Sequence, residues 1–309
     1  MKPAIQAGRL ALSSMWFQRW PDRRDLRPFF EAGASMGFEA FELSHDLPPE
    51  ALEQLPEGVR LPSIHHPCPR DPALGPAQGL LSSDPALRRA AAAALGATIE
   101  RAGRLGAEAV VLHLGQLEDA DDTCRRLRFE LEARHRAAQR DGRPYALALE
   151  RLKGILSRKE PEHLDRAIAV LPPLLDRAAR LGVRIGLETG YHAHELPTAT
   201  GMRRLLDQLS APGSIGAWLD TGHVAAREAI GIDRLDDWMA AVDGRWLGVH
   251  LHDCVGLRDH LVPGMGELDF AALARRFPAS ALRTCEIDWY FSAAEIASGL
   301  ARLSADGWV

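Results

Sequence analysis

Ile215-Gly216-Ala217-Trp218-Leu219-Asp220 is a short apolar run that ends in a carboxylate, and Thr221-Gly222-His223 follows it directly. A run of this length is too short for a helix and is typical of a buried strand. Seven other short runs, each followed by a segment with helical periodicity, share this pattern. They are Leu10–Leu12, Glu39–Glu42, Leu61–His65, Ala109–His113, Arg184–Glu188, Leu247–His250 and Arg283–Glu286. Alternating strands and helices predict parallel strands joined by crossover helices.

The spacing of the runs favours a closed barrel over an open sheet. Glu188 and Asp220 are 32 residues apart, Asp220 and His250 are 30 apart, and His250 and Glu286 are 36 apart. An open nucleotide-binding sheet usually carries a glycine-rich turn after its first strand, whereas residues 12–16 contain no glycine. Eight strand–helix units in 309 residues therefore predict a single α/β domain, a (β/α)8 TIM barrel spanning residues 1–309.

One interval is about twice the normal length. His113 and Glu188 are 75 residues apart, and we interpret residues 116–160 as a helical insertion after the fourth strand. We expect a charged helix over 121–140, a break at 141–144, a helix over 145–157 and the regular helix of the unit over 162–181. Because the insertion follows a strand, it should lie above the barrel mouth. A surface excursion, a dimer contact and a lid over substrate all fit this position.

Composition narrows the classes of function. The net charge is −5, and only three of the 37 basic residues are lysines, which disfavours nucleic-acid binding without excluding it. The four cysteines stand singly, as is usual in a reducing compartment. No apolar stretch approaches the roughly 18 residues of a membrane span, and the start resembles no signal peptide. We expect a soluble, cytoplasmic protein.

Ionisable residues stand at six of the predicted strand ends, namely His65, His113, Glu188, Asp220, His250 and Glu286. Active sites of such barrels lie at the carboxyl ends of the strands, so these side chains should converge. Three carboxylates at close range repel one another unless a cation neutralises them. Imidazoles and carboxylates together suit Zn²⁺, Mn²⁺, Fe²⁺ or Co²⁺. The sequence therefore predicts a divalent metal site at the barrel mouth.

Further candidate site residues lie in the segments near the ends of the predicted strands. His223 and His260 are further ligand candidates, while His66 should point away from the cavity because side chains alternate along a strand. His252 lies beyond the end of its strand, where contact with a substrate is possible. Trp16, Trp20, Trp289 and Tyr290 fit either the mouth or the core, and Trp16 is our candidate for a substrate contact. His45, His135 and His163 are interpreted as surface residues.

Several of these motifs resemble the xylose isomerase-like barrel superfamily, which contains sugar isomerases and epimerases as well as endonuclease-IV-type enzymes. The resemblance covers most of the chain outside the insertion and is carried by Phe38–Leu43, Leu219–His223, His250–Asp253, His260–Asp269 and Cys285–Asp288. It implies one divalent ion held by Glu188, Asp220, His250 and Glu286, with the two glutamates also acting as the acid–base pair. Proton transfer next to a carbonyl needs a base, an acid and a cation near the substrate oxygens.

The leading hypothesis is a metal-dependent isomerase or epimerase of a sugar or related polyhydroxy carbonyl compound. Its cofactor would be Mn²⁺, Zn²⁺, Co²⁺ or Mg²⁺, its partner a small-molecule substrate, and His223 would orient that substrate. A homodimer is compatible with the sequence. A barrel that has lost catalysis and only binds a ligand is a third possibility, which the intact quartet of ligands disfavours.

Endonuclease-IV-type enzymes imply a different function, that of a multinuclear zinc phosphodiesterase acting on abasic DNA or a small phosphoester. They hold three zinc ions, and the matching positions here are His65, His113, Glu188, Asp220, His223, His250, His260 and Glu286. A further aspartate is expected two residues before the loop histidine, where this chain has Arg258. Asp259 could take the place of this aspartate only if the alignment with the motif is shifted by one residue. One to three ions per chain are therefore compatible with the sequence.

Overall fold

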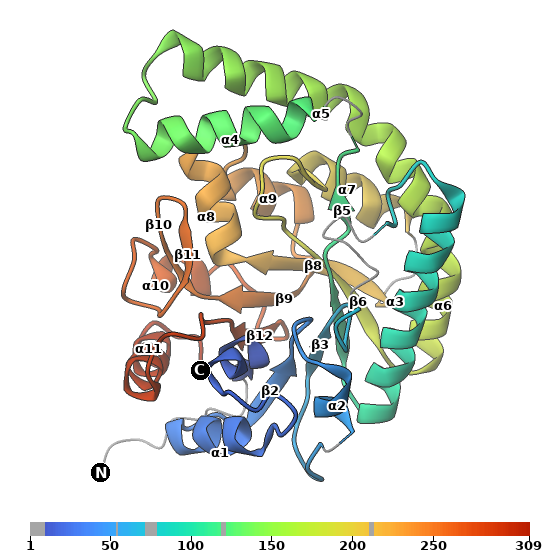
Figure 1. Ribbon diagram of the computed structural model, residues 1–309, viewed down its shortest axis with the longest axis vertical. Helices are drawn as coiled ribbons and strands as arrows, with labels where there is room; N and C mark the ends of the chain where they lie inside the picture. The colour runs from blue at the N-terminus through green and yellow to red at the C-terminus, as the bar shows by residue number, and fades with distance from the viewer. Residues whose placement is uncertain (1–9, 54, 72–78, 119–121, 210–212) are drawn as a thin grey trace.

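The computed structural model describes residues 10–53, 55–71, 79–118, 122–209 and 213–309, and its centre is a closed barrel of eight parallel strands (Figure 1). These strands are β1 (Leu10–Ser13), β2 (Ala40–Leu43), β3 (Ser63–His65), β4 (Ala109–Leu112), β6 (Arg184–Glu188), β8 (Ile215–Asp220), β9 (Trp246–Leu251) and β12 (Leu282–Cys285). Around the barrel they follow chain order, and β1 pairs with both β2 and β12 to close it. The predicted TIM barrel and all eight predicted strands are confirmed.

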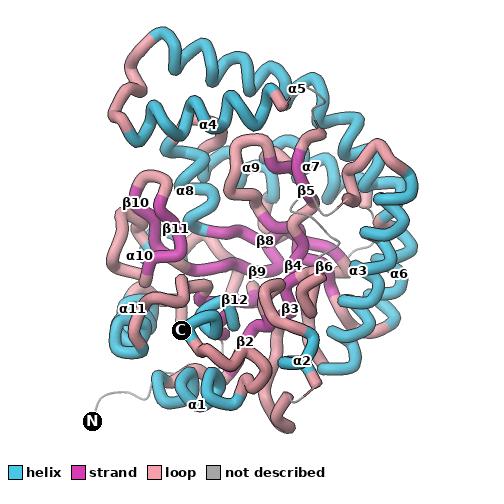
Figure 2. The backbone as a smooth tube through the Cα atoms, in the orientation of Figure 1, coloured by secondary structure: helices cyan, strands magenta, loops and turns pink. Residues whose placement is uncertain are grey.

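Helices surround the barrel and two short ribbons lie beside its strands (Figure 2). The helices are the 3₁₀ helix η2 (Ser14–Arg19), α1 (Arg27–Met36), α2 (Pro49–Leu52), α3 (Pro85–Leu105), α4 (Thr123–Arg136), α5 (Arg143–Val170), α6 (Pro172–Arg180), α7 (Ala199–Gln208), α8 (Thr221–Ala229), α9 (Leu235–Val242), α10 (Phe270–Ala274) and α11 (Ala293–Ala305). One ribbon pairs β5 (Gly115–Gln116) with β7 (Glu195–Leu196), and the other pairs β10 (Asp253–Val255) with β11 (Arg258–Leu261). No helix of the described residues is long and apolar enough to cross a membrane.

The segment between β4 and β6 differs in detail from its prediction. A break is present but lies at 137–142, because Arg143 and Pro144 already belong to α5, and α4 and the first half of α5 pack as an antiparallel pair at one edge of the molecule (Figure 1). However, α5 continues through Pro161 as one helix, so the expected boundary at residue 160 falls inside it. Buried residues occur on both sides of the proline, including Leu156 and Leu164, and their packing outweighs the hydrogen bond that proline cannot donate. That this segment is an insertion stays a prediction.

Trp218 is the largest side chain of a small buried cluster that also contains Ala109, Val111 and Leu247. Trp218 on β8 is fully buried, and Gly186 on β6 and Gly248 on β9 flank its ring. A Cβ atom at Gly248 would lie 2.2 Å from the indole, and one at Gly186 would lie 2.8 Å from it. The ring in turn packs edge-on against His250, with 5.2 Å between ring centroids. The two glycines therefore leave space for the indole, which packs beneath the residues at the mouth.

Replacing Gly248 with alanine should destabilise the barrel, because the added methyl group overlaps the buried indole of Trp218. Overpacking of this kind lowers the free energy of unfolding by about 1–3 kcal/mol. Gly154→Ala in α5 is the matched control, since its Cβ would contact only the end of Arg158, and we expect it to stabilise by up to about 1 kcal/mol. Chemical denaturation measures both variants, and equal stabilities would contradict the packing described.

Candidate metal centre

Four residues of neighbouring barrel strands meet at the carboxyl end of the barrel. Glu188, Asp220 and His250 end or nearly end β6, β8 and β9, and Glu286 follows β12. One ligand atom from each lies within 4.8 Å of the others, as the first coordination shell of one ion requires. His250 Nδ1 is central, at 2.7 Å from a Glu188 oxygen, 3.0 Å from a Glu286 oxygen and 3.8 Å from an Asp220 oxygen. The predicted quartet is thus brought together.

A second group lies beside the quartet and shares Glu188 with it. His65 Nε2 is 2.9 Å from Glu188 Oε2, and His113 Nε2 is 3.1 Å from the same oxygen. His65 is buried at the end of β3, whereas the His113 side chain after β4 is 27% exposed. Burial lowers the pKa of His113 to about 3, so its imidazole is neutral and its lone pair is available to an ion. The predicted placement of both histidines at the mouth therefore fits the structure.

A third group consists of Asp220, His223, His252 and His260, whose ligand atoms also lie within 4.8 Å of one another. Asp259 is not in this group, although its carboxylate is 3.8 Å from His223 Nε2 and 3.2 Å from His260 Nδ1. Arg258 points elsewhere, with a guanidinium nitrogen 3.4 Å from the Tyr290 hydroxyl. The one-residue shift that would make Asp259 a ligand stays a prediction.

The proton positions on two imidazoles suit metal binding. His65 Nδ1 is 3.1 Å from the carbonyl oxygen of His66, and His223 Nδ1 is 2.9 Å from that of Thr189. Because a carbonyl oxygen only accepts, each Nδ1 carries a proton and donates it. Burial would lower the pKa of His65, but the charge of Glu188 and its hydrogen bond raise it to about 9. An ion would therefore displace the proton on Nε2, which in both residues faces a carboxylate of the cluster. A hydrogen bond of this kind fixes the ring of a metal-ligating histidine.

His252 shows the opposite arrangement. It is fully buried, and its contact with a substrate stays a prediction. Its Nδ1 accepts the backbone N–H of His260 at 2.8 Å, so Nε2 must carry the proton of the neutral ring. That Nε2 lies 2.8 Å from an Asp220 oxygen and donates to it. His252 therefore orients Asp220 and is not free to donate a lone pair to an ion.

The charge balance of the cluster fits a divalent cation. Burial alone would lower the pKa of His250, but the charges of Glu286, Glu42 and Glu188 outweigh it and raise the pKa well above its usual value. Burial would raise the pKa of Glu188, and the surrounding imidazoles hold it well below its usual value instead. The carboxylates thus stay ionised and require positive charge beside them. The donor set of one imidazole and three carboxylates suits the ions predicted above.

Trp16 lies in the core and not at the open mouth. It is 1% exposed, its indole N–H donates to the carbonyl of Phe291 at 2.8 Å, and its ring packs edge-on against Trp20. A buried indole with its N–H already bonded presents no free group to a ligand. Of the two roles that the sequence allowed for Trp16, the structure favours packing, and we no longer propose it as a substrate contact.

Two residues near the cluster were missed. Glu42 near the end of β2 is fully buried, with its oxygens 3.1 and 3.2 Å from His250 Nε2. His45 was interpreted as a surface residue, and its side chain is indeed 44% exposed, but its ring centroid is also 4.8 Å from that of His65. Both follow the same signal as the predicted ligands, a polar residue at the end of an apolar run. His163, also interpreted as a surface residue, is buried and accepts the backbone N–H of Glu118.

The loop after β6 is held beside the mouth by a buried arginine. Arg227 of α8 is fully buried, donates to Asp233 at 2.6 Å and donates to the carbonyl of His192 at 2.7 Å. The same loop carries Tyr191, whose ring centroid is 5.7 Å from that of His223 and whose hydroxyl donates to the carbonyl of Leu257. The arginine therefore connects α8 to one wall of the mouth.

Replacing Arg227 with methionine should lower the free energy of unfolding by about 3 kcal/mol, because Asp233, whose side chain is only 11% exposed, loses its ion-pair partner. Arg234→Met is the control, since that side chain is exposed and its ion pair spans 4.0 Å; we expect a change below about 0.5 kcal/mol. Urea denaturation followed by circular dichroism measures both. Equal effects of the two substitutions would show that the buried pair does not support the loop.

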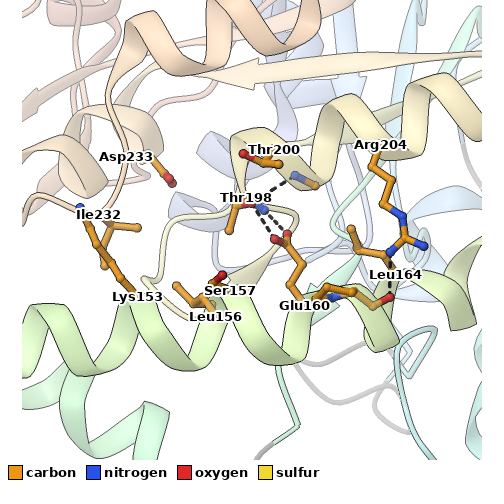
Figure 3. Close-up of a pocket in the computed structure, with 12 residues that line it drawn as sticks. Lys153, Leu156, Ser157, Glu160, Leu164, Thr198, Thr200, Arg204, Ile232 and Asp233 are labelled. Atoms are coloured by element: carbon orange, nitrogen blue, oxygen red, sulfur yellow. Dashed lines mark hydrogen bonds between the residues drawn. The ribbon is translucent and has the colours of Figure 1, made fainter.

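A separate cavity of about 320 Å³ lies between α5 and α7 and contains none of the predicted site residues. Its centre is the buried Glu160, whose carboxylate accepts the backbone N–H and the hydroxyl of Thr198, both at 2.7 Å (Figure 3). Arg204 spans the same region and donates to the carbonyl of Pro161. Glu160 is thus a buried carboxylate with its partners in place, outside the candidate metal centre.

The fold is a TIM barrel whose mouth carries side chains that could hold a metal ion, and the comparisons with known proteins identify the family. Residues 30–301 match the model of the xylose isomerase-like TIM barrel, so the chain belongs to this family. No curated protein matches the sequence.

Solved structures share the whole fold at low sequence identity. A D-tagatose 3-epimerase-like protein is 17% identical with a TM-score of 0.63, and the match covers 96% of this chain and 97% of that one. D-Psicose 3-epimerase from Clostridium cellulolyticum is 14% identical with a TM-score of 0.64, covering 96% and 98%. A protein of Thermus thermophilus, in a structure soaked with zinc chloride, is 21% identical with a TM-score of 0.61, covering 97% and 98%. At these identities the likeness shows the fold alone.

Proposed function

We propose that the protein is a metal-dependent isomerase or epimerase of a sugar or related polyhydroxy carbonyl compound. The observation that carries the proposal is the quartet of Glu188, Asp220, His250 and Glu286, whose ligand atoms lie within 4.8 Å at the mouth of a xylose isomerase-like barrel. The names of the similar structures, several of them ketose 3-epimerases, support the same class of substrate. Location in the cytoplasm and formation of a homodimer stay predictions.

The two glutamates are proposed as the acid–base pair. Each has an oxygen within 3.0 Å of His250 Nδ1, so both border the position where an ion would be held. Glu188 and Glu286 would remove a proton from the carbon next to a carbonyl and return it to the opposite face. A divalent ion, when bound, supplies positive charge for the oxygens on which negative charge develops. Asp220 would complete the set of ligands, and His223 would orient the substrate.

The three groups of ligands also favour a second candidate, a multinuclear zinc phosphodiesterase. Glu188 belongs to two groups and Asp220 to two, as bridging carboxylates would. However, the proton on His252 Nε2 removes one donor from the third group. The geometry therefore gives the strongest support to an ion at the quartet. It gives weaker support to a second ion at His65, His113 and Glu188, and the weakest support to a third ion.

Counting the bound ions separates the two functions. The purified protein is loaded with Mn²⁺ or Zn²⁺, dialysed against metal-free buffer and analysed by inductively coupled plasma mass spectrometry. About one ion per chain, together with deuterium exchange into ketoses in D₂O, supports the epimerase. Three zinc ions and cleavage of abasic DNA or of a small phosphodiester would overturn it in favour of the second candidate. Absence of any bound ion would contradict both.

A further inference from the structure

Glu42 is a buried carboxylate that the proposed chemistry leaves without a role. It is the penultimate residue of β2 and is fully buried, and both of its oxygens lie close to His250 Nε2, at 3.1 and 3.2 Å. β1 and β12 separate β2 from β9 in the barrel, so this contact crosses the barrel interior. It is therefore not a consequence of strand pairing and needs its own explanation.

Other donors fix the Glu42 carboxylate as an acceptor. The hydroxyl of Ser63 on β3 donates to Glu42 Oε2 at 2.6 Å, and that of Thr284 on β12 donates to the same oxygen at 3.3 Å. An ionised carboxylate only accepts, so the imidazole nitrogen that faces it must carry a proton. Nδ1 faces Glu188 and Glu286 at 2.7 and 3.0 Å, so by the same argument it also carries a proton until an ion is bound. An ion at the quartet would replace this Nδ1 proton, whereas Nε2 would keep the proton that it donates to Glu42, which leaves the Nδ1 lone pair for the ion.

We propose that Glu42 is a positioning residue that holds His250 in the Nε2–H form, so that its Nδ1 lone pair points at the ion bound by the quartet. The inference rests on the metal centre of the proposed function, although not on the identity of the substrate. Glu42 itself lies on the opposite side of the imidazole from the quartet and is not one of its ligands. A carboxylate behind a metal-bound imidazole also increases the basicity of the ligand.

The first test is the affinity of the full-length protein for Mn²⁺, measured by competition with a fluorescent chelator at constant pH. Glu42→Gln keeps the size of the side chain but removes the charge, and we expect affinity to fall about 10- to 100-fold. Ser63→Ala should cause a smaller loss, because it only loosens the carboxylate. The matched control is Glu160→Gln, a buried carboxylate outside the cluster, which should bind Mn²⁺ as the wild type does.

The second test needs no variant and is spectroscopic. In the Zn²⁺-loaded wild type, ¹⁵N-histidine NMR should show a proton on His250 Nε2, with a downfield shift from its bond to Glu42, and the metal on Nδ1. In Glu42→Gln this proton signal should move upfield, a change that general loss of stability would not produce. If Glu42→Gln does not fold, the wild-type spectrum still decides, since metal on Nε2 or a proton on Nδ1 would overturn the proposal.

The outcomes separate this inference from the function on which it rests. A wild type that binds Mn²⁺ and a Glu42→Gln variant that binds it within twofold would overturn the role of Glu42 alone. A wild type that binds no divalent ion would remove the metal centre itself, and with it both proposals. Weaker binding in Glu42→Gln, unchanged binding in Glu160→Gln and the expected wild-type spectrum together support the assignment.

Discussion

Replacing Glu286 with glutamine should reduce turnover by about 10³-fold or more, since the variant loses a proton-transfer group and a negatively charged ligand at once. The expected loss is large because Glu286 is a buried member of the quartet, with one oxygen 3.0 Å from His250 Nδ1 and the other accepting the hydroxyl of Ser13 at 3.4 Å. Glutamine has nearly the same shape, so the fold should be retained. Deuterium incorporation from D₂O into a panel of ketoses, followed by ¹H NMR, measures the proton transfer directly.

Two comparisons make this result specific. Glu188→Gln should cause a loss of the same order, because Glu188 is the other proposed acid–base group and contacts the same nitrogen of His250. Glu160→Gln should keep wild-type activity, although it also removes a buried carboxylate. A Glu286→Gln variant that retains activity within tenfold of the wild type would exclude Glu286 from the mechanism.

Removing divalent ions should lower the melting temperature markedly. An ion present at about 1,000 times its dissociation constant stabilises the folded state by about 4 kcal/mol. At roughly 2 °C per kcal/mol for a chain of this size, a strong chelator should lower the melting temperature by about 8 °C. The effect has a second cause here, because the buried carboxylates of Glu188, Asp220 and Glu286 repel one another when no ion lies between them.

Differential scanning calorimetry with and without chelator measures this effect, and added Mn²⁺ or Zn²⁺ should reverse it. In His250→Ala the chelator should have little effect, because the central ligand is missing. Unchanged melting of the wild type after exhaustive chelation would contradict a metal centre at the quartet.

The barrel could be predicted from the sequence because each strand has a local signal. Runs such as Arg184–Glu188 and Ile215–Asp220 are short and apolar, are followed by helices and recur at intervals of about one strand–helix unit. The quartet follows from the same pattern, since its members stand at the ends of successive strands. Parallel strands bring their carboxyl ends to one side of the barrel, so residues that end different strands in the sequence lie close together in the structure.

What the sequence could not show depends on contacts between distant segments. Nothing near His252 in the chain reveals that its Nδ1 accepts a backbone N–H from the β11 strand. Glu42 carried the same end-of-strand signal as the ligands, but its contact with His250 crosses the barrel. The continuation of α5 through Pro161 likewise depends on tertiary packing, which overrides the local tendency of proline to end a helix.

The order of the strands around the barrel divides the mouth into two unequal arcs. The carboxyl ends of β3, β4, β6, β8, β9 and β12 all carry candidate ligands or precede one, whereas the loops after β1 and β2 supply none to the groups found among the described residues. The loop after β2 borders the same opening, since the ring of its His45 lies 4.8 Å from that of His65. Substitutions in that arc could therefore admit a different molecule without altering the candidate ligands or the proposed proton-transfer groups.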